Sequence, residues 1–205
     1  MKILQIKASV FNGNGQSSRL ADQFVAELRA QHPGAEVVAR DLVADAVPHL
    51  DAARAGAFFA KPEERSAEQQ AVLAYSDALI DELRRADVVV LGLPMYNFGV
   101  PSQLKAWFDH IARAGVTFKY TEKGAVGLLT GKKAYVFAAR GGIYGETPND
   151  PQTQFVRQFL GFIGITDVEF VYAEGLALGD ESRNNSIAAA QAGARRLAAQ
   201  FRIAA

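Results

Sequence analysis

Short apolar runs alternate along the chain with longer stretches in which apolar residues recur every three or four positions. The short runs are typical of strands, and they cover residues 3–7, 36–40, 88–93, 134–139 and 168–172. The longer stretches predict helices, most clearly on the apolar stripe formed by Leu104, Trp107, Phe108 and Ile111. Strands that alternate with helices predict an α/β fold: an open, doubly wound, five-stranded parallel sheet with helices on both faces.

Local signals predict where some of these helices begin. Ser66 and Gln69 match a capping box, so a long helix is expected to start there. Residues 184–186, Asn-Asn-Ser, predict the start of the last helix. Residues 41–65 show weak helical periodicity and are predicted to form a long loop, a kind of segment that is often functional. Neither a linker nor a repeat divides the chain, so residues 1–205 are expected to form one domain.

The composition excludes several classes of function. The 205 residues include 22 basic and 22 acidic side chains, and this balance argues against nucleic-acid binding. Cysteine is absent and the three histidines are scattered, so disulfides and metal sites are not expected. Because the sequence shows neither a signal peptide nor a run of about 18 apolar residues, we expect a cytoplasmic protein without membrane contact. A redox enzyme of this composition would need an organic cofactor.

Three loops are candidates for the functional site. Doubly wound sheets bind ligands beyond the carboxyl ends of their strands, where the strand order reverses. In the order 2-1-3-4-5, the loops after the first, third and fourth strands border one crevice. These loops cover residues 9–18, 94–101 and 140–150.

The first loop is polar and glycine-rich and precedes a predicted helix. It lacks the lysine of a Walker loop and the third glycine of a dinucleotide fingerprint. Hydroxyls and backbone N–H groups at a helix N-terminus suit one phosphate monoester bound without a metal, and an ordinary capping loop is the alternative.

The other two loops fit a planar ligand. The second places Met95, Tyr96 and Phe98 in a segment expected to be exposed, where a flat aromatic ligand or a packing contact would explain them. In the third, Gly141 and Gly142 would let a ligand approach backbone N–H groups closely, although glycine pairs are also common in turns. A phosphate, an aromatic ring and backbone donors together describe a cradle for flavin mononucleotide (FMN).

Several stretches, taken in order along the chain, carry a resemblance to a known family. They are residues 94–98 (Pro-Met-Tyr-Asn-Phe), 113–118, 120–122, 130–134, 140–142 (Arg-Gly-Gly) and 159–165. Over essentially its whole length, the chain resembles the bacterial FMN-dependent NAD(P)H azoreductases and quinone reductases of the flavodoxin-like superfamily. The resemblance implies a flavodoxin-like fold with FMN as the cofactor.

The resemblance also implies roles for individual residues. Those implied to hold the FMN phosphate are Ser9, Gly15, Gln16 and Ser17. Those implied to border the isoalloxazine ring are Met95, Tyr96, Asn97, Phe98, Ala139, Arg140, Gly141 and Gly142. The backbone N–H of Asn97 would face flavin N5, and Gly141 and Gly142 would donate toward N1 and O2, where negative charge accumulates on reduction. The family commonly has serine at the positions of Gly15 and Ala139, so this chain keeps the backbone donors without those hydroxyls.

The reaction implied by the resemblance is ping-pong. NADH or NADPH transfers hydride to the flavin and leaves, and the reduced flavin then reduces a quinone, or cleaves an azo compound to aromatic amines. The cofactor carries the reactivity, so no side chain need be a general acid. Family architecture implies a homodimer with FMN at the interface and an apolar wall for the acceptor, and the candidates for this wall are Phe58, Phe59, Phe118, Tyr120 and Phe162. His110 is expected at the surface or in a dimer contact.

Two other functions are compatible with this fold. A flavodoxin-type electron carrier passes single electrons to protein partners, but such carriers are usually strongly acidic, whereas this chain is neutral. A regulator without cofactor chemistry is the other, and the aromatic second loop argues against it.

Overall fold

The computed structural model describes residues 1–202, apart from the side chain of Asn12. Its centre is a parallel sheet whose strands are β1 (Lys2–Lys7), β2 (Glu36–Asp41), β3 (Val88–Pro94), β6 (Lys133–Ala139) and β7 (Asp167–Ala173). Their order is β2-β1-β3-β6-β7, which confirms the predicted order 2-1-3-4-5. Every residue of β3 is buried, as expected for a central strand that is covered on both faces.

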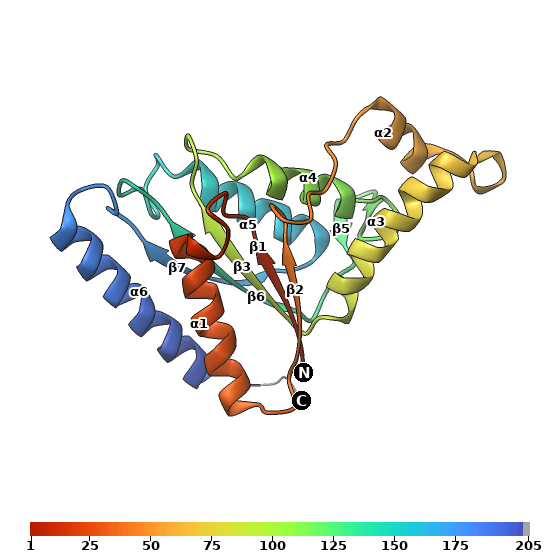
Figure 1. Cartoon of the computed structure of the whole chain (residues 1–205). Coiled ribbons are helices and arrows are strands. Elements are labelled where there is room, and N and C mark those ends of the chain that lie inside the picture. The colour runs from red at the N-terminus through yellow and green to blue at the C-terminus, as the bar shows by residue number, and fades with distance from the viewer. Residues whose placement is uncertain (203–205) are drawn as a thin grey trace.

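Helices cover both faces of this sheet, as predicted. One face carries α1 (Gln16–Gln31) and α6 (Asp180–Gln200), which lie side by side in Figure 1. The other carries α3 (Ala67–Arg85), α4 (Ser102–Ile111) and α5 (Pro151–Ile163). Each face buries its own cluster of apolar side chains, which contains the leucines of α1 on one side and Trp107 and Phe108 of α4 on the other.

A glycine in the central strand sets the position of α1. A Cβ atom on Gly92 would lie 3.2 Å from the carbonyl oxygen of Ser17. The bare backbone of Gly92 therefore lets the first turn of α1 pack tightly against the end of β3. This contact, together with the short helix η1 (Asn12–Asn14), places the first loop at the carboxyl edge of the sheet.

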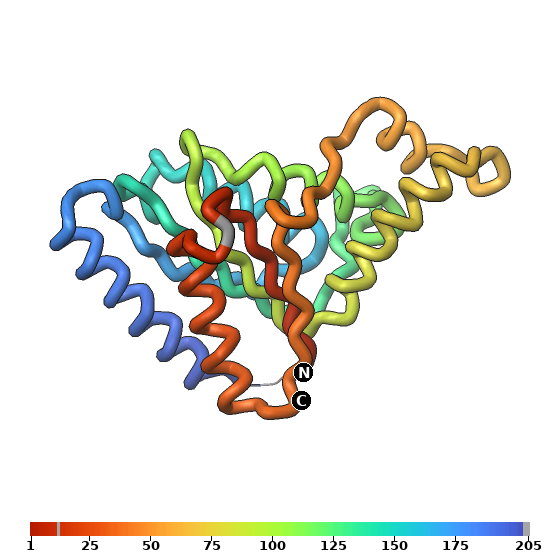
Figure 2. Tube along the Cα trace, in the orientation of Figure 1, coloured from red at the N-terminus to blue at the C-terminus, as the bar shows by residue number. Residues whose placement is uncertain are grey.

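Two segments differ from the sequence prediction. Residues 41–65 are not one loop, because they contain α2 (Ala52–Phe59) and the short helix η2 (Pro62–Glu64). The Asp51 side chain caps α2 by accepting the Arg54 N–H at 2.8 Å. Figure 2 shows that this segment projects from one end of the molecule. The second difference is an antiparallel hairpin of β4 (Phe118–Thr121) and β5 (Gly124–Gly127), which the sequence did not predict.

The predicted helix starts have different outcomes. The capping box is confirmed, since the Ser66 Oγ accepts the Gln69 N–H at 3.3 Å and the Gln69 Oε1 accepts the Ser66 N–H at 3.1 Å. The predicted start of the last helix at residues 184–186 is wrong, because α6 begins at Asp180. Ser186 serves a different purpose: its Oγ accepts the N–H of Glu174 at 2.8 Å. Within residues 1–202, no helix is both long and apolar enough to cross a membrane.

Candidate functional site

The three predicted loops meet in one crevice at the carboxyl edge of the sheet. Its volume is about 210 Å³, and its lining comes from the ends of β1, β3 and β6. The residues that line it are Ser9, Phe11, Asn14, Gly15, Gln16, Pro94, Met95, Tyr96, Ala139, Arg140, Gly141 and Leu176. Eight of the twelve residues predicted to bind the cofactor line this crevice, which is therefore the candidate functional site. The other four, Ser17, Asn97, Phe98 and Gly142, are not part of its lining.

The first turn of α1 provides unpartnered hydrogen-bonding groups. The hydroxyls of Ser17 and Ser18 are buried and find no partner among the described residues. The first N–H groups of any helix lack an intrahelical acceptor, and here the N-cap residue, Gly15, offers no side chain to cap them. Orphaned hydroxyls and free N–H groups at a helix N-terminus fit a bound phosphate group.

Ser9 is placed differently from the other phosphate candidates. Its Oγ accepts the Phe11 N–H at 3.3 Å and lies 3.4 Å from the hydroxyl oxygen of Tyr96. The Tyr96 hydroxyl in turn accepts the Val10 N–H at 3.2 Å. The Ser9 hydroxyl therefore ties the first loop to the second, while its residue still borders the crevice.

The second loop holds a tight turn with unusual backbone angles. Tyr96 and Gly99 exchange two backbone hydrogen bonds, of 3.0 and 3.3 Å, across Asn97 and Phe98. Asn97 has φ 49° and Phe98 has φ 65°, so both lie in the left-handed region that non-glycine residues seldom adopt. Such strain persists only where the surroundings hold it, and it clusters at functional sites. The Asn97 N–H at the tip of the turn has no acceptor among the described residues.

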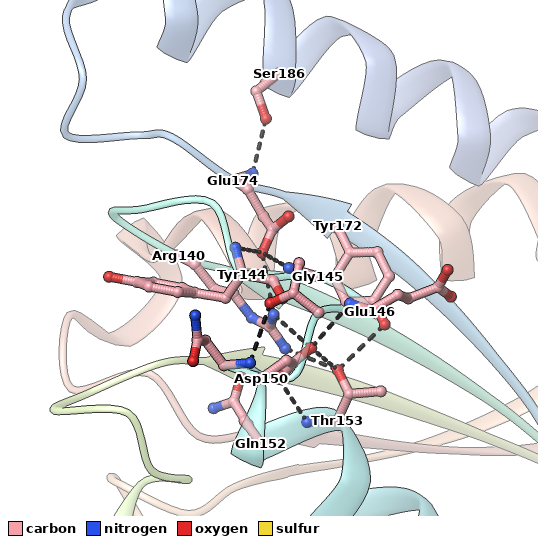
Figure 3. Close-up of polar contacts among 12 residues, drawn as sticks. Arg140, Tyr144, Gly145, Glu146, Asp150, Gln152, Thr153, Tyr172, Glu174 and Ser186 are labelled. Atoms are coloured by element: carbon pink, nitrogen blue, oxygen red, sulfur yellow. Dashed lines mark hydrogen bonds and ion pairs between the residues drawn. The ribbon is translucent and has the colours of Figure 1, made fainter.

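Arg140 is among the residues that line the crevice, but its side chain is buried. It is 1% exposed and lies in a buried polar network, drawn in Figure 3. Its Nη1 donates to Asp150 Oδ2 at 2.8 Å and to Glu174 Oε1 at 3.0 Å, and its Nη2 donates to Thr153 Oγ1 at 2.9 Å. The guanidinium also lies 5.0 Å from the ring centre of Tyr172. Arg140 is thus a structural cation that holds the third loop.

The two carboxylates of this network fix the loop that follows β6. The Glu174 Oε1 also accepts the N–H groups of Tyr144 at 2.9 Å and Gly145 at 2.7 Å. Burial raises the pKa of Asp150, but hydrogen bonds from Arg140 and Thr153 outweigh it and hold that pKa below its ordinary value. Asp150 is therefore ionised at neutral pH and pairs with the buried guanidinium.

The backbone of the third loop leaves two donors free. The carbonyl groups of Gly141 and Gly142 accept the N–H groups of Ala177 at 3.0 Å and Gly175 at 2.9 Å. The N–H groups of the two glycines have no acceptor among the described residues. In contrast, the N–H of Arg140 donates to the Ala173 carbonyl at 2.9 Å and is not available. The glycine pair therefore has two free backbone donors, and one of its residues, Gly141, lines the crevice.

The five aromatic candidates for an acceptor wall fall into two groups, neither of which lines the crevice. Phe118 packs on Phe162 with ring centres 4.2 Å apart and on Tyr120 at 5.5 Å, so the hairpin and α5 bring these three together. Phe58 is half-buried in its own chain, whereas Phe59 is 83% exposed at the end of α2.

His110 is buried, so the prediction of a surface or dimer-contact histidine is wrong. It is 1% exposed, and its ring lies edge-on to Phe58 and Tyr75 at 6.0 and 5.8 Å. Its Nδ1 lies 3.0 Å from the Ala106 carbonyl oxygen. Burial lowers the pKa of His110, which favours the neutral ring. The histidine is buried because Phe58 of α2 and Tyr75 of α3 pack against it, and the stripe on α4 alone could not predict these contacts.

Sequence reasoning missed Gln152, Glu174 and Tyr144. Gln152 is 1% exposed at the start of α5, and its Nε2 donates to the carbonyl oxygens of Pro94 at 2.9 Å and Gly99 at 3.0 Å. Tyr144 packs edge-on against Phe98, with ring centres 5.5 Å apart. A lone glutamine, glutamate or tyrosine next to a loop carries no sequence signal of such a role, because its partners lie far along the chain.

The chain is similar to known proteins over nearly its whole length. A family model described as a flavodoxin-like fold matches residues 1–198. The chain is 58% identical over 191 residues to the "FMN-dependent NADH:quinone oxidoreductase" of Alcanivorax borkumensis, covering 93% of this chain and 96% of the relative. A relative of the same name from Burkholderia thailandensis is 60% identical over 189 residues, with coverage of 92% and 96%.

The fold is also similar to that of solved azoreductase structures. An azoreductase from Bacillus anthracis superposes with a TM-score of 0.90 at 31% identity, covering 98% of this chain and 100% of that one. An FMN-dependent NADH-azoreductase of the same species, solved in complex with FMN, gives a TM-score of 0.84 at 30% identity, with coverage of 96% and 99%.

Proposed function

This chain belongs to the family with the flavodoxin-like fold, and we propose that it is an FMN-dependent NADH:quinone oxidoreductase that also cleaves azo compounds. The observation that carries the proposal is the crevice, where three loops meet that hold unpartnered backbone donors and buried hydroxyls in or next to its lining. The names of the relatives support NADH as donor and a quinone as acceptor, and those of the solved structures support azo compounds.

The residues present fit FMN. Bound there, FMN supplies the two-electron redox chemistry, and the protein supplies position and electrostatics. The first turn of α1, with the hydroxyls of Ser17 and Ser18, would hold the phosphate, because its free N–H groups and the helix dipole favour an anion. The turn at Asn97 would border the ring, with the Asn97 N–H toward N5. The N–H groups of Gly141 and Gly142 would donate toward N1 and O2 and so stabilise negative charge there.

We extend the proposal to NADPH as a second donor. The residues that line the crevice include no acidic side chain, so the lining has no charge to repel the additional phosphate of NADPH. The enzyme would work in the cytoplasm, where both donors are available and where a chain without cysteine needs no oxidising compartment.

The proposal includes a homodimer that completes the acceptor site. Apolar hollows of about 480 and 470 Å³ lie beside the second loop and along α5, and their aromatic lining consists of Phe98, Phe155, Phe159 and Phe162. Tyr120 on the hairpin is 74% exposed. Exposed apolar surface of this kind marks an interaction site. Because Phe118, Tyr120 and Phe162 do not line the crevice of their own chain, a second copy would bring them over the flavin.

The test begins with the purified protein and its visible spectrum. We expect the yellow absorption of bound FMN, which is bleached when NADH or NADPH is added without oxygen. Benzoquinone and an azo dye, added separately, should each restore the yellow colour, and the dye should lose its own. Failure of both donors to bleach the flavin would refute the oxidoreductase and favour an electron carrier. Reoxidation by benzoquinone alone would leave a quinone reductase, and a fully active monomer in sedimentation would refute the shared site.

A further inference from the structure

Gln152 contacts the turn that the proposed function places beside the flavin. The turn of Tyr96 to Gly99 is joined to α5 by the Gln152 side chain, whose Nε2 donates to the carbonyl oxygens of Pro94 and Gly99 at 2.9 and 3.0 Å. Pro94 is the last residue of β3, and Gly99 closes the turn. One amide therefore holds both ends of the segment that carries Asn97.

The turn is held by its own two backbone hydrogen bonds and by one side chain outside it. Asn97 and Phe98 both have left-handed backbone angles, and such a conformation is retained only where neighbouring groups hold it. Within residues 1–202, no side chain other than that of Gln152 donates a hydrogen bond to the backbone of residues 94–101. The amide binds the two carbonyls that flank the strained residues, so it limits how far the Asn97 N–H can turn.

The oxygen of the Gln152 side-chain amide indicates that the role of this residue is to donate hydrogen bonds from Nε2. The Oε1 is buried and finds no partner among the described residues. A buried, unpaired acceptor carries a desolvation penalty, so an apolar side chain of similar volume would suit this site better if packing were the only demand. Among the described residues, the Gln152 amide therefore makes hydrogen bonds only through its Nε2.

We propose that Gln152 is a positioning residue for hydride transfer, which holds the Asn97 N–H toward flavin N5 by bracing the turn of residues 96–99. This inference rests on the proposed function. Gln152 is not among the residues that line the crevice, although it borders the apolar hollow beside the second loop. Its effect passes through the backbone of the turn.

The test compares Gln152→Met with a matched control, Gln154→Met. Methionine keeps the length and volume of glutamine but removes both hydrogen bonds, and Gln154 is an exposed residue on the same helical turn. At saturating NADH, Gln152→Met should slow flavin reduction about 10-fold to 100-fold, because small displacements of a positioning group have effects of this order. Its Kd for FMN should stay within about threefold of the wild type, since other loops hold the phosphate.

A spectroscopic readout separates positioning from general damage. With isotope-labelled FMN, the nitrogen NMR signal of N5 should shift in Gln152→Met and coincide with that of the wild type in Gln154→Met. A Gln152→Met protein that keeps both the wild-type rate and the wild-type N5 signal would overturn the inference, as would a rate loss that merely follows lost FMN. If NADH does not bleach the flavin of the wild type, the proposed function itself fails, and the N5 signal still tests the brace.

Discussion

Gly127→Ala tests how the hairpin is attached to the body of the protein. Gly127 is the last residue of β5 and crosses the C-terminal end of α5. A Cβ atom at this position would lie 2.1 Å from the Gly164 nitrogen and 2.4 Å from the carbonyl carbon of Ile163. Both are backbone atoms, so no rotamer change can relieve the clash. The hairpin or the end of α5 must move.

The loss of folding stability in Gly127→Ala can be estimated for each of two structural responses. If the backbone absorbs the clash, overpacking costs about 1–3 kcal/mol. If the hairpin detaches instead, Phe118, which is 7% exposed, loses its contact with Phe162, and exposing a phenylalanine costs about 1.5–3 kcal/mol. The two outcomes together give a loss of about 1–3 kcal/mol. For a chain of this size, each kcal/mol lowers the Tm by about 2–4 °C, so the Tm should fall by about 2–12 °C.

Thermal unfolding followed by circular dichroism, with the same excess of FMN in every sample, measures this loss. The control is Gly56→Ala in α2, where no atom lies within 4 Å of the added Cβ. This change should raise stability by about 0.5–1 kcal/mol, because alanine is the better helix residue. The Gly127→Ala protein should still bind FMN, since the crevice loops are unchanged. A Tm at or above that of the wild type would show that β5 and the end of α5 leave room for a Cβ atom at this position.

Three further predictions concern the turn, the buried histidine and the buried ion pair. Asn97→Gly should keep most of the rate of flavin reduction measured by stopped flow, because glycine readily adopts φ 49° and retains the N–H. Asn97→Val should slow flavin reduction more than about tenfold, because a β-branched residue disfavours this backbone angle. Equal rates for the two variants would contradict a role for the Asn97 backbone. Burial lowers the folded-state pKa of His110. As the pH is lowered below about 6.5, this histidine is therefore protonated in the unfolded chain before it is protonated in the folded one, and the stability of the fold decreases. His110→Phe should reduce this fall in urea unfolding between about pH 7.5 and 5.5, and an unchanged slope would refute the assignment. Asp150→Asn removes one of the two carboxylates that pair with Arg140. Because Glu174 still pairs with the guanidinium, the variant should cost about 3 kcal/mol at most in the same assay at neutral pH, against under about 1 kcal/mol for exposed Asp180→Asn. Because the folded pKa of Asp150 is depressed, its contribution is present above about pH 4 and is lost as pH falls through the folded value, so the variant should have a flatter acid limb.

The fold was predictable because burial repeats with the period of each element. The continuous run of residues 88–93 indicated the central strand, and the stripe on residues 104–111 indicated α4. Neither α2 nor the hairpin was predicted, because neither shows a clear repeat of buried positions. Eight residues of α2 are too few for a clear period, and the hairpin has only Phe118 buried, so neither leaves a strong pattern.

The sequence by itself determined which loops form the candidate site. Parallel strands end at one edge of the sheet, so the segments after β1, β3 and β6 had to meet there whatever their side chains do. Only the tertiary structure decided which groups in those loops face a ligand. Arg140 turns inward to Asp150 and Glu174, and Gln152 reaches back 58 residues to Pro94. Such directions depend on charges and carbonyl groups brought close by packing, and local sequence patterns do not report those contacts.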